Sequence, residues 1–465
     1  MSEKSKPKKK SSVRHTRAIQ RDRTKRPNSA PPDQKIEARL TEIIHPATLN
    51  QVAYFHELGL RERILTLPIM MAFVVSLIWR HLGSVTEAVR VLTLEGLLWV
   101  RPQAVSQQAV EQRLGSLPPI LFARVFHEVL PRLAERWQAR TRPLAPALAW
   151  AQRHFTGVVA LDGSTLDSLL RKCGLLRDGE GPVLAGRMAG LLDLISRLPR
   201  ELWYEPDQHA HDQRFWERAL AVLERGMLLI FDLGFLNFVR FDQLTDAGVW
   251  FVTRLQDRIV YRVETVLQAS AQRHDLIVWV GSGKDSQCVH PLRLLEVQHN
   301  GRWYRYLSNV LDPRLLPAEY VVALYWQRWR IEDAFNIVKR LLGLAYFWTG
   351  SINGVQVQVW ATWILYAVLV DLTDAVAEAL DKPFQAVSLE MVYRGLYHFT
   401  QAYHRGDAAD PVAYLAANAA TLGIIKRKRK KRTSPGDLLY LIIHEDPPAA
   451  EELVRARMAV GLDKP

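Results

Sequence analysis

Hydrophobic residues recur at helical spacing from about residue 35 to residue 150, after a polar segment at 1–34. The apolar stretches at 64–79 and 85–100 are the clearest examples. A period of 3.6 residues is typical of helices that pack one apolar face on a core. We therefore expect an all-α domain over residues 35–150. It follows a basic tail at 1–34, which has no apolar period and should be disordered.

A helix, a short turn and a second helix are expected within this domain. Ser106 is suited to cap the first helix, which Gly115 would end, and Pro118-Pro119 would begin the next. This arrangement resembles a helix-turn-helix, a motif that places a helix in a groove of DNA. The polar side chains expected on its outer face are Gln107, Gln108, Gln112 and Arg113. A plain helical bundle predicts the same pattern, so both interpretations stay open.

The period changes near residue 157, where short runs of β-branched and apolar residues begin. These runs predict strands within 157–164, 187–194, 200–204, 227–232 and 249–255, with helices near 211–226 and 237–246. The run MLLIFDLGF is apolar up to Asp232, which is typical of a strand covered on both faces. The order of strands and helices predicts an α/β fold.

A different pattern occupies residues 256–312. Apolar and polar residues alternate there, and Asn300-Gly301 is a strong hairpin signal. We interpret this segment as a β-rich insertion within the α/β domain. Helical patterns return from about residue 318 and continue through an apolar helix at 354–380. The C-terminal region, 401–465, is expected to be helical and basic.

The segment YWQRWRIEDAFNIVKR, residues 325–340, contains no Pro or Gly and is expected to form an amphipathic helix. Its apolar positions are Leu324, Ile331, Phe335, Val338 and Leu342. A polar stripe lies beside them, within an arc of roughly 60° at 100° per residue, and consists of Tyr325, Arg328, Glu332 and Lys339. A carboxylate between two cations suits a metal-bound phosphodiester. A solvated helix face with charge pairs predicts the same stripe.

Two aspartates, Asp162 and Asp232, each end an apolar strand and are followed by a glycine within two residues. Side chains at the carboxyl ends of neighbouring strands can point into one crevice. Together with Glu332 they would supply hard oxygen ligands of the kind that Mg²⁺ or Mn²⁺ prefers. Either aspartate alone is also a common turn or helix-cap residue.

The net charge of +13 is concentrated in two runs. Residues 1–34 hold a net charge of +8 and residues 426–432, KRKRKKR, hold +7. Such runs indicate a polyanionic partner, nucleic acid first, although a solubilising tail has the same composition. Two cysteines without metal-ligand spacing fit a reducing cytoplasm. We expect no secretory signal and no membrane partner, because the apolar stretches are short of about 18 to 20 residues.

These residues together resemble a known family. Asp162 in LDGS, Asp232 in DLGF, and the pattern Tyr-x2-Arg-x3-Glu-x6-Lys are similar to the DDE transposases of bacterial insertion sequences, specifically the insertion-sequence-four (IS-four) group. The resemblance spans roughly residues 40–400. It implies a ribonuclease-H-like catalytic core at 151–255 and 313–400, interrupted by the β-rich insertion at 256–312.

The resemblance also implies a site and a reaction. Asp162, Asp232 and Glu332 would hold two Mg²⁺ or Mn²⁺ ions, and three residues of the helix would contact DNA phosphates: Tyr325, Arg328 and Lys339. The implied partners are transposon-end DNA and target DNA, bound by a homodimer in the bacterial cytoplasm. In relatives that use a hairpin DNA intermediate, a tryptophan of the insertion stacks on a flipped base. The resemblance implies this role for Trp279 or Trp303 here, and packing in the sheet is the alternative role. Two other functions stay open: a DNA-binding protein without catalysis, and a metal-dependent nuclease without strand transfer.

Overall fold

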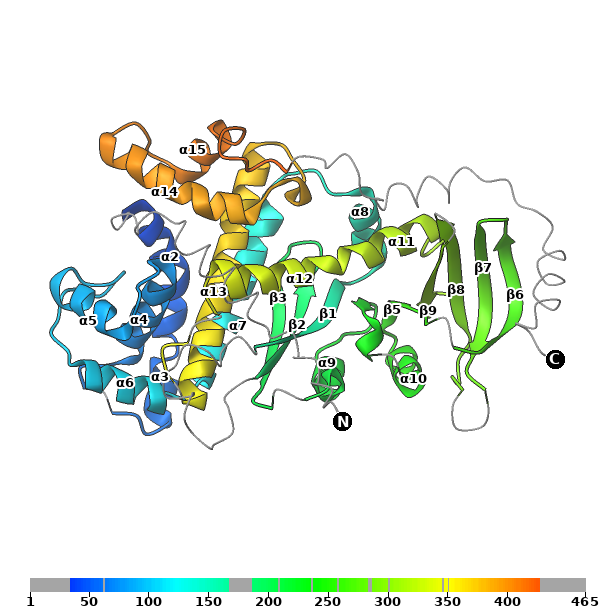
Figure 1. Ribbon diagram of the computed structural model, residues 1–465, viewed down its shortest axis with the longest axis horizontal. Coiled ribbons are helices and arrows are strands. Elements are labelled where there is room, and N and C mark those ends of the chain that lie inside the picture. The colour runs from blue at the N-terminus through cyan, green and yellow to red at the C-terminus, as the bar shows by residue number, and fades with distance from the viewer. Residues whose placement is uncertain are drawn as a thin grey trace, which may run out of the picture.

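The computed structural model of the chain has a helical end, a central sheet and a purely β end (Figure 1). It describes residues 34–61, 63–166, 186–207, 210–235, 237–256, 259–282, 287–299, 302–344, 347–349 and 351–426. The predicted disordered tail, most of the basic run at 426–432 and the Asn300-Gly301 turn lie outside the described residues.

Helices fill the N-terminal part, as the hydrophobic period predicts. They are α2 (Gln34–Leu49), α3 (Val52–Glu57), α4 (Leu67–Trp79), α5 (Val85–Leu94), α6 (Gln107–Ser116), α7 (Ile120–Ala139) and α8 (Pro146–His154). The hydroxyl of Ser106 caps α6 by accepting from the Ala109 N–H at 3.1 Å, as predicted. Helix α6 runs past Gly115 to Ser116, so the prediction that Gly115 ends it is wrong. Leu117 leaves the helix instead, with extended backbone.

These helices do not form a core of their own. Helix α7 packs along α13 (Ile352–Ala379), and one continuous hydrophobic cluster runs from the N-terminal helices through α13 to one face of the sheet. Figure 1 shows α13 between the N-terminal helices and the strands. Among the described residues, α13 alone is long and apolar enough to cross a bilayer, and 89% of its most apolar window is buried inside the protein.

One nine-stranded mixed sheet has the order β3-β2-β1-β4-β5-β9-β8-β7-β6. Its first five strands are β1 (Val158–Thr165), β2 (Arg187–Asp193), β3 (Pro199–Glu205), β4 (Leu228–Phe231) and β5 (Trp250–Arg254). Strands β1, β4 and β5 are parallel, whereas β2 pairs antiparallel with β1 and β3 pairs antiparallel with β2. The predicted strands are therefore present and adjacent in one sheet.

Successive side chains of the central strands point alternately into two hydrophobic cores, one on each face of the sheet. In β1, Val158 and Ala160 belong to the core shared with α13, while Val159 and Leu161 belong to a second core. The second core is covered by α10 (Phe238–Asp246) and the short α9 (Trp216–Leu220), which follows a 3₁₀ turn (Asp212–Phe215). The helix predicted over 211–226 is thus much shorter than expected. The N-cap of the 3₁₀ turn is His211, rather than Asp212.

Residues 261–308 form four antiparallel strands that extend the sheet beyond β5. They are β6 (Tyr261–Ala269), β7 (Arg273–Val280), β8 (Leu292–His299) and β9 (Arg302–Ser308). The last of them, β9, pairs with β5, so this β-rich segment continues the central sheet and does not form a separate layer.

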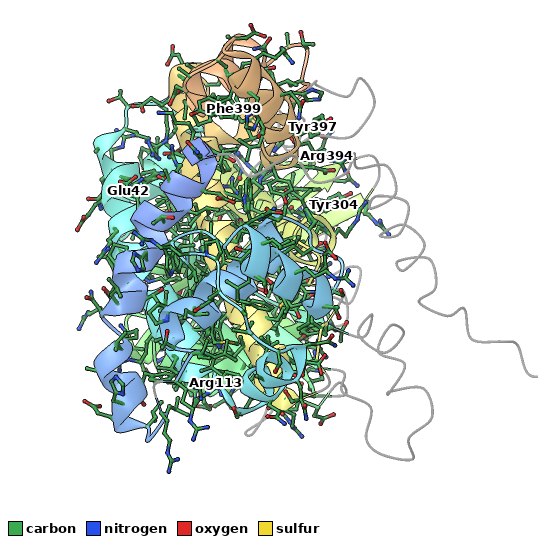
Figure 2. The ribbon with its side chains drawn as sticks, turned by 90° about the vertical axis from the view of Figure 1, so that its left-hand side faces the viewer. Glu42, Arg113, Tyr304, Arg394, Tyr397 and Phe399 are labelled. Carbon is green, nitrogen blue, oxygen red and sulfur yellow. The ribbon has the colours of Figure 1, made fainter. Side chains whose placement is uncertain are left out.

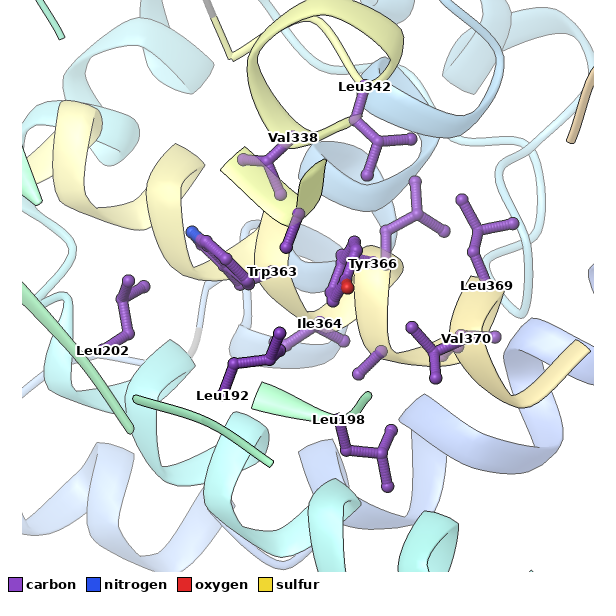
Figure 3. Close-up of a cluster of buried hydrophobic side chains, with 14 of the residues drawn as sticks. Leu192, Leu198, Leu202, Val338, Leu342, Trp363, Ile364, Tyr366, Leu369 and Val370 are labelled. Atoms are coloured by element: carbon purple, nitrogen blue, oxygen red, sulfur yellow. The ribbon is translucent and has the colours of Figure 1, made fainter. Parts of the chain in front are cut away.

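The chain then crosses one face of the sheet as α11 (Ala318–Gln327), α12 (Trp329–Asn336) and a π-helical turn (Ile337–Leu341). All five positions of the predicted apolar stripe are buried. Figure 3 shows Val338 and Leu342 of this segment against Trp363 of α13 and Leu192 of β2. A 3₁₀ turn (Phe384–Ala386), α14 (Leu389–Arg405) and α15 (Pro411–Ala417) complete the described chain. Figure 2 labels Arg394, Tyr397 and Phe399 of α14.

Candidate active site

The alternation of side chains in the parallel strands directs both candidate aspartates to one face. Asp162 continues the series of Val158 and Ala160, and Asp232 continues that of Leu228 and Ile230, all on the α13 side of the sheet. Strands β1 and β4 are paired in parallel, with Leu161 opposite Phe231. The two carboxylates therefore leave neighbouring strands side by side, at the ends where parallel strands commonly form a crevice.

The helical segment at 318–341 brings the remaining candidates over that crevice. Its hydrogen-bonded pattern is interrupted at Arg328, between α11 and α12, although Arg328 keeps helical backbone angles. The π-helical turn carries Lys339. Single π turns in helices are frequent at functional sites.

The guanidinium of Arg328 joins all three carboxylates. Its Nη1 lies 2.9 Å from Asp162 Oδ2 and 2.9 Å from Glu332 Oε1, and its Nη2 lies 3.8 Å from Asp232 Oδ2. Because two carboxylate oxygens contact the same nitrogen, they are separated by no more than twice that distance. The three carboxylates thus converge, as the sequence predicts.

Burial differs across this cluster. The Arg328 side chain is 5% exposed and that of Asp162 is 16% exposed, whereas Asp232 and Glu332 are 41% and 34% exposed. Burial raises the pKa of Asp162 to about 6, although Arg328 and the hydrogen bond from the Gly163 N–H oppose the rise. The cluster is therefore an incompletely neutralised group of carboxylates with one open side.

Tyr325 and Lys339 complete the polar stripe. The Tyr325 hydroxyl donates to Asp232 Oδ1 at 2.9 Å, which fixes one oxygen of that carboxylate. Burial raises the pKa of Tyr325, and Asp232 adds to the rise, so the phenol stays protonated and remains a donor. The Lys339 ammonium donates to the Ser164 hydroxyl and the Thr165 carbonyl, just beyond Asp162 on β1.

The donor set suits a divalent cation in its chemistry, because carboxylate oxygens are the ligands that Mg²⁺ and Mn²⁺ prefer. Within the described residues, however, no three His, Cys, Asp or Glu side chains are arranged to hold one ion directly. The reason lies in Arg328, whose Nη1 contacts Asp162 and Glu332 at once. A cationic side chain thus stands between two of the carboxylates that would be ligands.

Two charged residues beside the cluster escaped prediction. Asp212 pairs with Arg187 and lies so close to Gly163 that a Cβ there would meet its carboxylate. Arg254 ends β5, next to β4, and its charge opposes the rise in the pKa of Tyr325. The position of Arg254 at a parallel strand end was a usable signal. Asp212 gave none, because its partner Arg187 is 25 residues away.

The two candidate stacking tryptophans lie on opposite faces of the β-rich segment. Trp303 stacks on His274 with ring centroids 4.6 Å apart. By the alternation of β7, His274 and Trp279 point to opposite faces. Trp279 shares its face of the sheet with Asp275. Asp275 is paired with Leu295 of β8, and Leu295 is paired with Tyr306 of β9, whose ring contacts Tyr325. Of the two, Trp279 is therefore on the same side as the helical segment at 318–341.

Comparisons with known proteins bear on this arrangement. Residues 187–368 match the family described as a transposase DDE domain. The chain is 29% identical over 253 residues to a putative transposase, y4zB, of Sinorhizobium fredii (strain NBRC 101917 / NGR234), covering 53% of this chain and 66% of that protein. It is 25% identical over 147 residues to a probable transposase for insertion sequence element IS5377 of Geobacillus stearothermophilus, covering 30% of this chain and 38% of that protein.

These matches support a transposase function. The family match includes Asp232 and the helix with Glu332, and it leaves Asp162 outside. The chain spans slightly less than two thirds of the first relative's length. Among solved structures, the piggyBac transposase synaptic complex with hairpin DNA aligns over 90% of this chain and 87% of that chain, with 11% identity and a TM-score of 0.39.

Proposed function

We propose that the chain is a DDE transposase that binds the ends of an insertion sequence, cleaves them and joins them to target DNA. The observation that carries this proposal is the convergence of Asp162, Asp232 and Glu332 from two adjacent parallel strands and one helix onto a shared arginine. The match of residues 187–368 to a transposase DDE domain supports it from an independent direction.

Within this proposal the strand order β3-β2-β1-β4-β5 is a ribonuclease-H-like core, and β6–β9 are its insertion. The spacing Tyr-x2-Arg-x3-Glu-x6-Lys assigns the chain to the IS-four group. The N-terminal helices and the basic runs bind DNA. The active assembly is a homodimer on two DNA ends in the bacterial cytoplasm.

Asp162, Asp232 and Glu332 would hold two divalent cations, Mg²⁺ or Mn²⁺. When bound, such ions supply Lewis acidity to the attacking and leaving oxygens of a phosphodiester. The protein prepares its ligands in advance. The Gly163 N–H and the Tyr325 hydroxyl each fix one carboxylate oxygen, and Arg328 holds the three carboxylates together before ions bind.

The cations of the helix have a role toward DNA. Arg328 and Lys339 carry positive charge at the edge of the carboxylate crevice, and a guanidinium recognises phosphate oxygens with two parallel donors. With cations held by the carboxylates, the Arg328 guanidinium would be free to donate to a phosphate of the cleaved end. Lys339, now on Ser164 and Thr165, lies at the end of β1, beside Asp162.

The test is cleavage of a labelled duplex that carries the element's own terminal repeat, in Mg²⁺ or Mn²⁺. We expect the wild type to cut at the repeat boundary, and Asp232→Ala and Glu332→Ala to lose at least about 100-fold in rate, because each removes a ligand of the reacting centre. Glu319→Gln, in the first turn of α11 and outside the cluster, is the matched control and should cut normally.

The products separate the remaining functions. Joining of the freed 3′ end to a target plasmid completes the assignment. Cleavage without joining would reduce the protein to a metal-dependent nuclease. Binding of the repeat without cleavage in any divalent metal would refute the catalytic assignment and leave a DNA-binding protein.

A further inference from the structure

A second charged site lies on the other side of α12 from the three carboxylates. It is a pocket of about 320 Å³ between the α12–π segment, the 3₁₀ turn Phe384–Ala386 and the start of α14. Two carboxylates, Asp333 and Glu390, face a larger set of cations in its lining: Arg197, Arg330, Arg340, Arg394 and Lys426. The pocket therefore carries an excess of positive charge.

Arg197 is the most unusual residue of this lining. It is 3% exposed, and its Nε and Nη1 have no hydrogen-bond partner, while Nη2 donates to Gln327 at 3.0 Å. A buried guanidinium with unused donors is costly unless a ligand engages them. Its backbone has φ of 67°, a conformation that non-glycine residues adopt at a cost and that gathers at functional sites.

The backbone around Arg197 holds it in this conformation. The tight turn between β2 and β3 is stabilised by the Asp193 carboxylate, which accepts from the backbone of Ile195 and Ser196. The Arg197 N–H donates to the Asp193 carbonyl, and its own carbonyl accepts from the Tyr366 hydroxyl. The backbone of Arg197 is therefore fixed before any ligand arrives, and Gln327 holds one nitrogen of its guanidinium.

Lys426 is held at the pocket by backbone pairing. Ile425 forms a β-bridge with Val387, and the Lys426 N–H donates to the Ala386 carbonyl at 2.8 Å. Lys426 as a residue is exposed, but desolvation of its ammonium among the atoms of the pocket lowers its pKa to about 8, and Arg330 and Arg197 lower it further by repulsion. The positive charges of this pocket are thus close enough to repel one another.

We propose that this pocket is a second anion site, separate from the carboxylate cluster, which binds a phosphate group. Arginines recognise phosphate oxygens through their fork of donors, and the volume accommodates a phosphate with its attached sugar. DNA backbone is the favoured source, because the sequence continues from Lys426 with six further basic residues, Arg427 to Arg432. A phosphate bound here neutralises the excess charge and occupies the unused donors of Arg197.

The site is coupled to the catalytic helix through shared residues. Gln327 Oε1 accepts from both Arg197 and Arg330, and Gln327 ends α11 directly before Arg328. Arg330 also pairs with Asp333 at 3.2 Å on the pocket side of α12. A phosphate in the pocket therefore contacts the back of the helix whose front carries Arg328 and Glu332.

The experiment measures binding alone, so it stays informative if the proposed catalysis fails. Fluorescence anisotropy with a labelled random-sequence 20-base-pair duplex, in EDTA, compares the full chain with Arg330→Gln and Arg394→Gln over a salt series. Arg405→Gln is the matched control, because Arg405 is on α14 with a 63% exposed side chain and does not line the pocket. Thermal unfolding of each variant checks that it is folded.

We expect each pocket variant to weaken binding by about 3- to 10-fold and to reduce the slope of log affinity against log salt by about 0.9, the value for one lost phosphate contact. Arg394→Lys keeps the charge and should retain most of the affinity. Calorimetry with inorganic pyrophosphate is the second arm, with one site expected in the wild type and none in Arg394→Gln.

The outcomes identify the source of the phosphate. Loss of both duplex and pyrophosphate binding supports a DNA phosphate in the pocket. Loss of pyrophosphate binding with an unchanged duplex slope supports the site but assigns it to a free phosphorylated molecule. If folded Arg330→Gln and Arg394→Gln match Arg405→Gln in both arms, the proposal is wrong.

Discussion

Two groups of carboxylates in this protein differ in their ratio of arginines to carboxylates. Arginines outnumber the carboxylates in the group on α13, and carboxylates outnumber the arginine in the candidate active site. On α13, Asp371 and Asp374 have side chains only 1% exposed and are each paired with two or more arginines from the N-terminal part of the chain: Arg39, Arg136, Arg140 and Arg142. In the candidate active site, the three carboxylates share a single arginine, Arg328, among the described residues, and two of the three are more than one-third exposed.

The difference distinguishes a structural ion-pair group from a reactive one. The α13 group is fully enclosed and rich in cations, so it fixes α13 against α7 and the segment that follows α7. The Arg328 group is short of positive charge and open on one side. A site that must accept divalent cations needs such a deficit, because a fully neutralised cluster has no electrostatic reason to bind them.

Removing a carboxylate from the α13 group should have the largest effect on stability. Asp371→Asn leaves Arg39 and Arg140 without their buried anion, and breaking a buried pair from one side costs about 3 to 5 kcal/mol in free energy of unfolding. Urea unfolding followed by circular dichroism measures it. Asp407→Asn, which removes the exposed partner of Arg405, should cost less than about 0.5 kcal/mol. A loss below about 1 kcal/mol for Asp371→Asn would remove the contrast.

Replacing the shared arginine should make the reactive group dependent on metal. Arg328→Met leaves three carboxylates facing one another, and we expect a loss of about 2 kcal/mol, less than in the α13 group because two of these carboxylates are hydrated. Added Mg²⁺ should restore stability in this variant more than in wild type, because an ion that binds only the folded state stabilises it. Thermal unfolding with Mg²⁺ or EDTA measures this.

Lys339→Met provides the control for that comparison, since it removes a cation that contacts Ser164 and Thr165 rather than the carboxylates. Equal Mg²⁺ responses in wild type, Arg328→Met and Lys339→Met would show that Arg328 does not occupy the place of a cation.

A carboxylate-to-amide change in the reactive group should not lower the free energy of unfolding, whereas the same change on α13 should lower it. Burial raises the pKa of Asp162 above its ordinary value to about 6, so the folded protein holds the ionised form at pH 7.5 at a cost. Asp162→Asn removes that cost and should leave the free energy of unfolding in EDTA unchanged or up to about 1 kcal/mol higher. Urea unfolding of this variant beside Asp371→Asn is the direct comparison. A large destabilisation would show that Asp162 is structural.

The sequence was sufficient for the parts of the fold in which one residue pattern decides the structure. The run MLLIF before Asp232 is apolar at every position, so it became a strand between two cores, and the stripe of Ile331, Phe335 and Val338 placed a helix on the sheet. The convergence of Asp162, Asp232 and Glu332 followed because strand ends and helix faces have fixed directions.

Other features depend on partners that are distant in the chain. Asp371 lies within a helix that reads as apolar, and its arginines are more than 200 residues away, so no local pattern signals the pair. The π turn at Ile337–Leu341 follows from packing, since its residues suit an ordinary α-helix equally well. Arg197 lines its pocket from a turn with positive φ, and the hydrophobic periods of helices and strands do not predict the conformation of such a turn.

The smallest effect is expected at a partly exposed ion pair that joins α7 to β3. His127 of α7 contacts both Glu201 oxygens of β3 through Nε2, at 3.0 and 3.1 Å, and its Nδ1 lies 2.8 Å from the Ala123 carbonyl. The hydrogen bond with Glu201 raises the pKa of His127 above its ordinary value of 6.5, against the opposing effect of burial. Protonated His127 therefore donates from both nitrogens and stabilises the folded state.

Because the folded-state pKa is the higher one, this contribution is complete below about pH 6.5 and disappears as pH rises through the folded pKa. The difference in free energy of unfolding between wild type and Glu201→Gln should be about 0.2 to 1 kcal/mol at pH 6 and close to zero at pH 9. Urea unfolding across this range measures it. The control is His154→Gln, because His154 contacts the Trp150 carbonyl and forms no ion pair with a described residue. A difference that grows with pH would mean that Glu201 acts on another group, and α7 would then be held to the sheet by packing rather than by this pair.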